Sequence, residues 1–167
     1  WNSGGYDRVE TLAALEGKIQ IYLPDYKYTD PDTARRYAGA ADYPETARAA
    51  IREMVRQTGP YQLDENGILT RGVILRHLLL PGGLNQAKEV MDWVAETFPP
   101  HTILFSLMSQ YTPWGKAADY PPLDRRLRKS EIRAAEAYFT NLGLDGFTQG
   151  VEAAQADYIP TFDLTGV

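Results

Sequence analysis

Three short apolar runs along the chain predict buried strands. The first, Lys18–Leu23, continues into a charged end, Asp25–Tyr28, within the segment IQIYLPDYKY. The other two, Gly72–Leu80 and Thr102–Met108, are apolar at nearly every position. This pattern is typical of parallel strands that are buried on both faces. We therefore expect three central strands in a parallel sheet.

Helical periodicity fills the segments between these strands. The expected helices are Arg8–Leu15, a helix from Pro31 to about Tyr37, Pro44–Thr58, Asn85–Phe98 and Lys129–Leu142. The third is the most clearly amphipathic, with Ala47 and Met54 on its apolar face. Asn66-Gly67, between two short alternating runs, predicts a small hairpin. The repeated βα order predicts an α/β fold with right-handed crossovers.

Composition and charge narrow the class of protein. The chain has 167 residues, enough for a single domain with a core, and we expect one domain over residues 1–167 with a surface tail over residues 147–167. A net charge of −5 argues against nucleic acid as a partner. No apolar stretch approaches the roughly 20 residues that cross a membrane, and no signal peptide opens the chain. These features predict a cytoplasmic protein.

Neither cysteine nor histidine offers a metal site. The chain has no cysteine, which excludes disulfides and thiolate ligands, and it has only two histidines. His77 lies within an apolar strand and is expected to be a hydrogen-bonded structural residue. The chain opens with Trp1-Asn2-Ser3-Gly4-Gly5, which reads as the end of a strand followed by a tight turn. We therefore expect it to be an internal or C-terminal piece of a longer protein.

The candidate chemistry lies where the strands end. Side chains alternate along a strand, so Asp25 and Lys27 point to one side. A buried charge is costly unless it is paired. The two residues therefore either pair with each other in a wall or hold a zwitterionic, hydroxyl-bearing small molecule. Arg76, in the second strand, has the same two alternatives: a ligand contact or an ion pair with Asp25. The ends of parallel strands meet on one side of a sheet, so these groups are expected to form one site.

Two other features carry open alternatives. Trp114, in the Pro- and Tyr-rich loop after the third strand, either lines the access to a site or anchors the loop by packing, and we expect the packing role. The basic run Arg125–Lys129 is expected to be a solvated face. Its alternative is a docking site for a protein substrate.

Four segments together resemble a known family. NSGGYD near the start, then LPDYKY, RHLLLPGG and LMSQYTP, in this order and at these spacings, resemble the later half of radical S-adenosylmethionine proteins, in the branch of pyruvate formate-lyase activating enzyme. The similarity runs from Trp1 to about Leu144. A strand that ends in D-x-K is a weak signal alone, whereas the four segments together are specific.

The resemblance implies a fold and a chemistry. The family fold is a partial (β/α) barrel of parallel strands. An N-terminal C-x-x-x-C-x-x-C loop binds a [4Fe-4S] cluster, which cleaves S-adenosylmethionine to a 5′-deoxyadenosyl radical. This chain has no cysteine. It is therefore expected to be the C-terminal part of such an oxidoreductase, to carry part of the S-adenosylmethionine pocket, and to be inactive alone.

The resemblance also assigns pocket residues. Asp25 and Lys27 match the family's D-x-K, which contacts the ribose and the methionine part of S-adenosylmethionine. Ser3 matches a turn residue that helps to hold the amino acid end of the ligand. Arg76 matches the arginine of an R-Y-x-x-x-P-G strand.

Two further positions are assigned to the adenine. Leu78 matches an apolar residue beside the adenine, and Tyr111 stands where relatives have a histidine. Tyrosine can stack on a purine as histidine can, but its proton chemistry differs. No metal ligand is expected in this chain.

Two functions remain open at this point. The first is the C-terminal portion of a radical S-adenosylmethionine oxidoreductase, and the second is a non-catalytic βα module for binding or interaction. With the cluster loop and the family's glycine-rich strand missing, we expect weak binding of S-adenosylmethionine or none. A half-barrel bares a strand edge, and such edges associate readily. We therefore also expect a homodimer through the exposed barrel edge, or an edge covered by the tail after Phe147.

Overall fold

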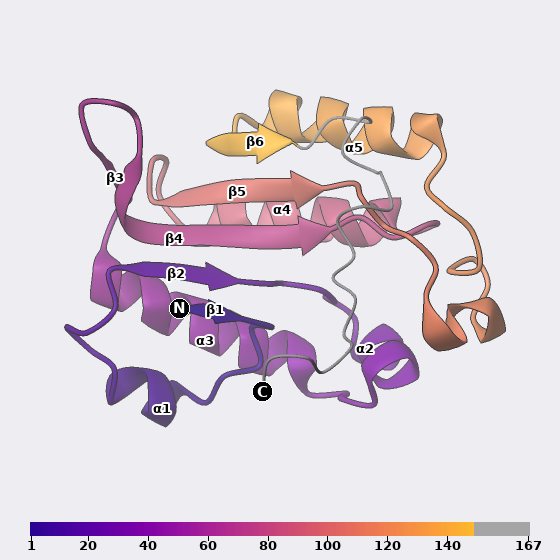
Figure 1. Cartoon of the computed structure of the whole chain (residues 1–167), viewed down its shortest axis with the longest axis horizontal. Coiled ribbons are helices and arrows are strands. Elements are labelled where there is room, and N and C mark those ends of the chain that lie inside the picture. Colours follow the sequence, from indigo (N-terminus) through magenta and orange to yellow (C-terminus); the bar gives the residue numbers. More distant parts are fainter. Residues whose placement is uncertain (149–167) are drawn as a thin grey trace, which may run out of the picture.

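A parallel sheet organises the molecule. The structure is a computed structural model and describes residues 1–148. The strands lie in the order β1 (Asn2–Ser3), β2 (Ile21–Pro24), β4 (Leu69–Leu78), β5 (Ile103–Met108) and β6 (Gly146–Thr148) (Figure 1). Every pair along this path is parallel. The short strand β3 (Gln62–Leu63) pairs antiparallel with β4. The predicted parallel pairing of the three central strands is confirmed.

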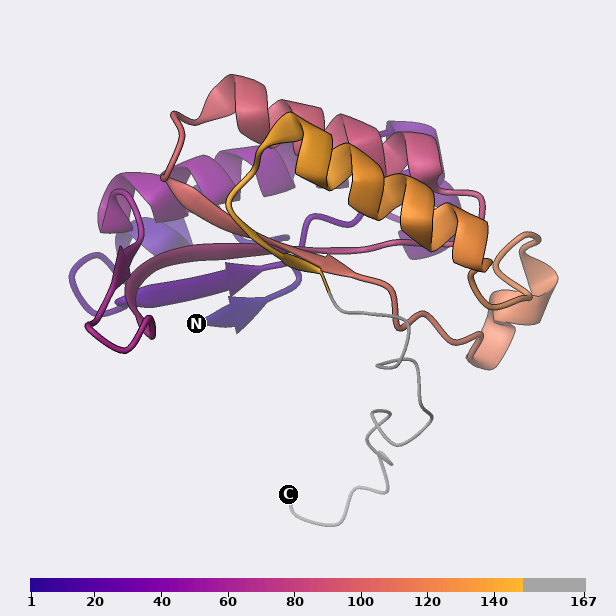
Figure 2. The ribbon, with the colours of Figure 1, turned by 90° about the horizontal axis from the view of Figure 1, so that it is seen from above.

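Helices cover one face of this sheet. They are α1 (Val9–Ala13), α2 (Pro31–Ala38), α3 (Tyr43–Thr58), α4 (Leu84–Thr97) and α5 (Lys129–Leu142), with a 3₁₀ helix, η1 (Gly115–Asp119), in the loop after β5. Figure 2 shows α3, α4 and α5 on the same side of the strands, with the sheet curving beneath them. The fold is thus a mixed α/β structure with a parallel sheet, consistent with a partial (β/α) barrel.

Burial along β4 distinguishes the two faces of the sheet. Val73, Leu75 and His77 are buried against the helices, whereas Ile74 and Arg76 stay partly exposed on the other face. The nearly continuous apolar pattern of this strand therefore has two causes. One row of side chains fills the core, and the other row forms a half-covered apolar face on which Arg76 is a charged exception.

Several element boundaries differ from the sequence prediction. The first long strand begins at Ile21 rather than Lys18, because the turn that follows α1 still includes Lys18, whose N–H donates to Leu15 O over 2.9 Å. The second begins earlier than predicted, at Leu69, because the hairpin extends it. Asp64 stabilises that hairpin by accepting hydrogen bonds from Asn66 N and Ile68 N.

The predicted surface tail is wrong at its first residues. Phe147 belongs to β6 and pairs with Ser106 of β5, so the sheet gains a strand where weak periodicity had indicated none. Such a short strand carries too few residues to show alternation. The rest of that tail, residues 149–167, lies outside the described residues.

Glu131 joins α5 to the turn after β4. Its carboxylate accepts from Gly82 N at 2.8 Å, from Arg128 N at 2.8 Å and from both terminal nitrogens of Arg125 at 2.8 and 2.9 Å. Arg125 first, and then the two backbone donors, hold the pKa of Glu131 at about 2, against the opposing effect of burial. Part of the basic run is thus paired inside the protein rather than solvated.

This carboxylate should make folding stability depend on pH. A lowered pKa in the folded state means that the contribution of Glu131 is complete above its ordinary value of 4.5 and is lost as the pH falls towards about 2. We expect Glu131→Gln to lower the melting temperature at pH 7 and to flatten its decline between about pH 5 and pH 2. Circular dichroism melts across this range measure both effects. Glu65→Gln, at the exposed hairpin tip, is the control, and an unchanged acid limb in Glu131→Gln would contradict the assignment.

Candidate functional site

The carboxyl ends of β2, β4 and β5 surround one cavity. It has a volume of about 430 Å³, and Asp25, Lys27, Leu78 and Tyr111 are among its lining residues. These four come from three separate parts of the sequence, and parallel pairing brings them together because the strands end at the same edge of the sheet. The loop after β5, with η1, supplies the remaining side of the cavity.

Asp25 is the electrostatic centre of this edge. Its Oδ1 lies 2.7 Å from Arg76 Nη2, and its Oδ2 lies 3.4 Å from Lys27 Nζ. Arg76 Nη2 also donates to Asn2 Oδ1 over 2.6 Å. One carboxylate therefore binds two cations and links the ends of β1, β2 and β4. Of the two sequence alternatives, the pairing of Asp25 with Lys27 is observed, and both residues also line the cavity.

The ion pair between Asp25 and Arg76 includes polar atoms that form no hydrogen bond. Although Arg76 Nη2 lies within ion-pair distance of Asp25 Oδ1, the geometry makes no hydrogen bond to that oxygen. Asp25 Oδ1 and Arg76 Nε are both buried atoms without a hydrogen-bond partner. A buried polar atom left unpartnered costs free energy. The contact between Arg76 and Asp25 is therefore an ion pair without an aligned hydrogen bond.

Tyr43 fixes the end of β2 against the turn after β1. Its hydroxyl accepts from Lys27 N over 2.9 Å, donates to Gly4 O over 2.9 Å and lies 3.1 Å from Asp25 O. Burial raises the pKa of this hydroxyl well above its ordinary value of 10.0, so it remains protonated. The backbone that carries Asp25 and Lys27 is therefore held from α3.

His77 has a structural role, as predicted. It points to the helix side of β4, and its Nδ1 lies 2.7 Å from Tyr26 O. Burial lowers the pKa of His77, so the ring is neutral and Nδ1–H donates to the carbonyl. This bond joins β4 to the segment after β2, directly behind Asp25.

Two of the assigned residues do not line the cavity. Arg76 contacts it only through Asp25. Ser3 lies in the turn after β1, where its hydroxyl donates to Asp7 Oδ2 over 2.6 Å and accepts from Gly5 N over 3.2 Å. The structure thus gives Ser3 a local role in shaping the turn that packs against Asp25.

Several lining residues were not assigned to the site by the sequence analysis. Tyr37 of α2 and Lys116 and Tyr120 of the loop after β5 line the cavity, and so does Trp114, for which cavity access was one of the two alternatives. The expected packing role of Trp114 is wrong, because this side chain is 78% exposed. The available signal was the concentration of aromatic residues in a loop directly after a strand end.

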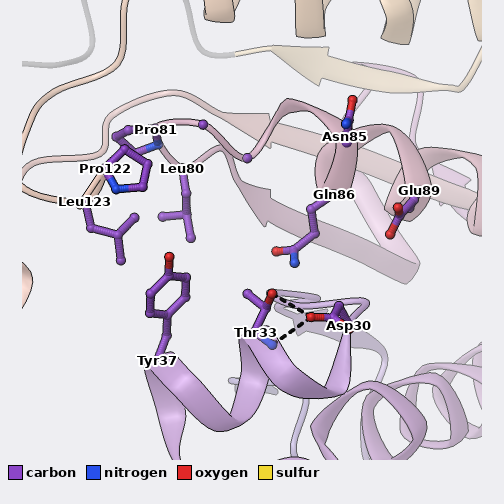
Figure 3. A pocket seen from close by; sticks show the side chains of 12 residues that line it. Asp30, Thr33, Tyr37, Leu80, Pro81, Asn85, Gln86, Glu89, Pro122 and Leu123 are labelled. Carbon is purple, nitrogen blue, oxygen red and sulfur yellow. Dashed lines mark hydrogen bonds between the residues drawn. The ribbon is translucent and has the colours of Figure 1, made fainter. Parts of the chain in front are cut away.

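A second hollow of about 290 Å³ adjoins the first, and the two share Tyr37, Leu80 and Leu123. Figure 3 shows Asp30 and Thr33 of the α2 region on one side and residues of α4 on the other. Asp30 caps α2 by accepting from Thr33 N and Thr33 Oγ1, both at 2.7 Å. Asp30 Oδ2 thus serves as the helix cap, and we take the strand-end cavity, which joins the ends of three strands, as the candidate site.

Neither metal ligands nor a spanning helix is found in the described part of the chain. Within residues 1–148, no three or more His, Asp or Glu side chains gather in a way that could hold a metal ion. Over the same residues, no helix has the length and apolar character needed to cross a bilayer.

Comparison with known proteins gives a sequence relative and likenesses to solved structures. No protein-family model matches the sequence. An uncharacterized protein of Methanocaldococcus jannaschii, MJ0674, is 28% identical over 146 residues, which cover 87% of this chain and 38% of that protein. The chain thus spans well under half the length of this relative.

The structural likeness supports the fold. A crystal structure of a domain of pyruvate-formate lyase-activating enzyme from Bacteroides vulgatus matches with a TM-score of 0.62. The match covers 89% of this chain and 79% of that chain, at 15% sequence identity. At this identity the likeness concerns the arrangement of strands and helices.

Proposed function

We propose that this chain is the C-terminal part of a radical S-adenosylmethionine oxidoreductase of the activating-enzyme type and supplies part of its S-adenosylmethionine pocket. One observation carries the proposal. Asp25, Lys27, Leu78 and Tyr111, which the sequence resemblance assigns to this ligand, line a single cavity of about 430 Å³. The fold shared with a domain of pyruvate-formate lyase-activating enzyme supports it.

The lining suits the chemistry of the ligand. S-adenosylmethionine combines a charged amino acid end, ribose hydroxyls and a flat adenine. Asp25 accepts hydrogen bonds from hydroxyl or ammonium groups, and Lys27 donates to a carboxylate or a hydroxyl. Leu78 and Tyr111 offer apolar and aromatic surface to a ring. The volume lies in the range of cavities that enclose small organic ligands, about 300–1,000 Å³.

The position of Asp25 fits this assignment. Its side chain is 19% exposed and lines the cavity, where the carboxylate can accept from a ligand hydroxyl or ammonium. In the family, S-adenosylmethionine is the source of the 5′-deoxyadenosyl radical. The residues of this chain would bind and orient S-adenosylmethionine, with Arg76 and Lys27 holding the Asp25 side chain in place.

The residues of this chain do not fit an iron–sulfur cluster. Such clusters are held by cysteine thiolates, and the chain has no cysteine. In our proposal the [4Fe-4S] cluster is bound by another part of a longer protein. The chain alone is therefore expected to bind S-adenosylmethionine weakly and to catalyse nothing.

Titration with S-adenosylmethionine tests the proposal. We expect saturable binding with a dissociation constant above about 10 μM, since only part of the pocket is present. Binding should be at least about tenfold weaker in Asp25→Ala and unchanged in Asp32→Ala, an exposed carboxylate on α2. An unchanged dissociation constant in Asp25→Ala would overturn the assignment of the site. No saturable binding up to about 10 mM would favour the alternative of a non-catalytic interaction module.

Self-association is a further part of the proposal. Within residues 1–148, β1 pairs only with β2 and β6 only with β5, so both edges of the sheet are open. Trp1 and Phe147, at these edges, are 47% and 46% exposed. Open edges with exposed apolar side chains promote pairing with another chain. Light scattering should report a dimer, and a monomer at all concentrations would refute this point.

A further inference from the structure

We propose that Trp114 is a positioning residue of the strand-end cavity that stacks on the planar ring of the bound ligand. The inference rests on the proposed function, because it takes the ligand to carry an adenine. It concerns a residue of the loop after β5 that neither the sequence resemblance nor the comparisons assign. The observations come from the way this loop is held.

The loop is fixed at both ends. Near its start, the Tyr111 hydroxyl donates to Leu123 O over 2.7 Å, which ties the two sides of the loop together. Near its end, the Tyr120 ring packs edge-on against Tyr37 of α2, with ring centroids 5.9 Å apart. A chain of tyrosines continues inward from Tyr37 through Tyr28 to Tyr43. These contacts place the middle of the loop at the cavity.

The side chains in the middle of the loop are not buried. No residue of η1 is buried, and Trp114, immediately before η1, is 78% exposed although it lines the cavity. Its indole takes part in none of the aromatic pairs formed within residues 1–148. A large aromatic face left to water at a cavity wall gains free energy when a flat apolar group covers it.

The residues that line the cavity also indicate which part of a ligand would lie beside Trp114. The carboxylate of Asp25 and the ammonium of Lys27 come from the end of β2, whereas the loop brings the aromatic rings of Trp114 and Tyr120 together with the cation Lys116. A ligand with one charged, hydroxyl-bearing part and one flat ring matches both sets of groups. Base stacking on an aromatic side chain tolerates any purine face and strengthens binding by roughly five- to a hundredfold. Trp114 therefore positions the ring, and Asp25 with Lys27 holds the polar part.

Nuclear magnetic resonance of the chain tests this inference with S-adenosylhomocysteine as the probe. The chain has three tryptophans, so its spectrum should contain three indole N–H signals, and Trp114→Phe identifies one by its loss. We expect the Trp114 indole and the Lys27 amide to shift with a single dissociation constant. The Trp1 and Trp93 indoles should stay in place. Methionine, which lacks the ring, should leave the Trp114 indole unmoved.

Substitutions complete the test. Trp114→Ala should weaken binding of S-adenosylhomocysteine about tenfold, and Trp114→Phe should keep it within about threefold. Trp1→Ala, another exposed tryptophan, is the control. A shift of the Lys27 amide with a stationary Trp114 indole, or an unaltered affinity in Trp114→Ala, would overturn the inference and leave the proposed function standing. No shift at any lining residue at about 10 mM probe would overturn both.

Discussion

Alanine at position 5 should destabilise the chain by about 3 kcal/mol or more, a large fraction of the roughly 5–15 kcal/mol by which a folded domain is usually stable. Gly5 has a φ of +78°, which side chains rarely adopt. A Cβ there would also overlap the carbonyl oxygen of Asp25 and lie 3.4 Å from the Tyr43 hydroxyl. Both neighbours are fixed, one in the backbone and the other by its hydrogen bonds, so the strain has no inexpensive relief.

Gly17→Ala is the matched control. Gly17 has nearly the same φ, +77°, but a Cβ added there would meet nothing within 4 Å. Gly17→Ala should therefore lower the free energy of unfolding by only about 1 kcal/mol, which is the cost of holding a side-chain-bearing residue at a positive φ. Urea unfolding of both variants measures the difference. Equal losses would show that the turn after β1 does not pack closely against Asp25.

Removal of the Asp25 carboxylate should weaken both folding and ligand binding. Asp25→Ala leaves Arg76, whose side chain is only 23% exposed, without its anionic partner. Deleting one partner of a buried pair costs about 3–5 kcal/mol, and the partial exposure here reduces our expectation to about 2 kcal/mol. Binding of S-adenosylmethionine should weaken at least about tenfold, because the ligand loses its acceptor.

A double variant separates the ion pair from the ligand site. Asp25→Ala combined with Arg76→Met removes Asp25 and the less exposed of its two cationic partners, and should recover more than half of the lost stability, since only Lys27, which is 46% exposed, then lacks a partner. Binding should not recover. Denaturant unfolding and ligand titration of the single and double variants measure the two effects. Recovery of binding together with stability would mean that Asp25 acts only as a wall residue.

The sequence predicted those parts of the fold that depend on local patterns. Three apolar runs separated by amphipathic helices led to parallel pairing, because the crossovers and the two buried faces leave few other arrangements. Alternation along β2 correctly placed Asp25 and Lys27 on one side, and both line the same cavity. The structural role of His77 was expected because it lies within an apolar strand, and its Nδ1 does bond to Tyr26 O.

Contacts between distant segments could not be predicted in the same way. Trp114 was expected to pack inward, since most tryptophans do, but its direction depends on how Tyr111 and Tyr120 hold the loop. The link of Arg76 to Asn2 joins residues that lie 74 positions apart. The strand that contains Phe147 depends on pairing with β5, which no pattern within three residues reveals.

Photolabelling with 8-azido-S-adenosylmethionine, followed by peptide mapping, tests the central claim most directly. The claim is that the ends of β2, β4 and β5 form one S-adenosylmethionine site. It predicts labelled peptides from residues 78–80 and 108–123, which the account places beside the adenine that carries the azide, with the labelling suppressed by an excess of unlabelled S-adenosylmethionine. Suppressible labelling confined to the outer helices α3 and α5, or labelling that the unlabelled ligand does not suppress, would contradict it.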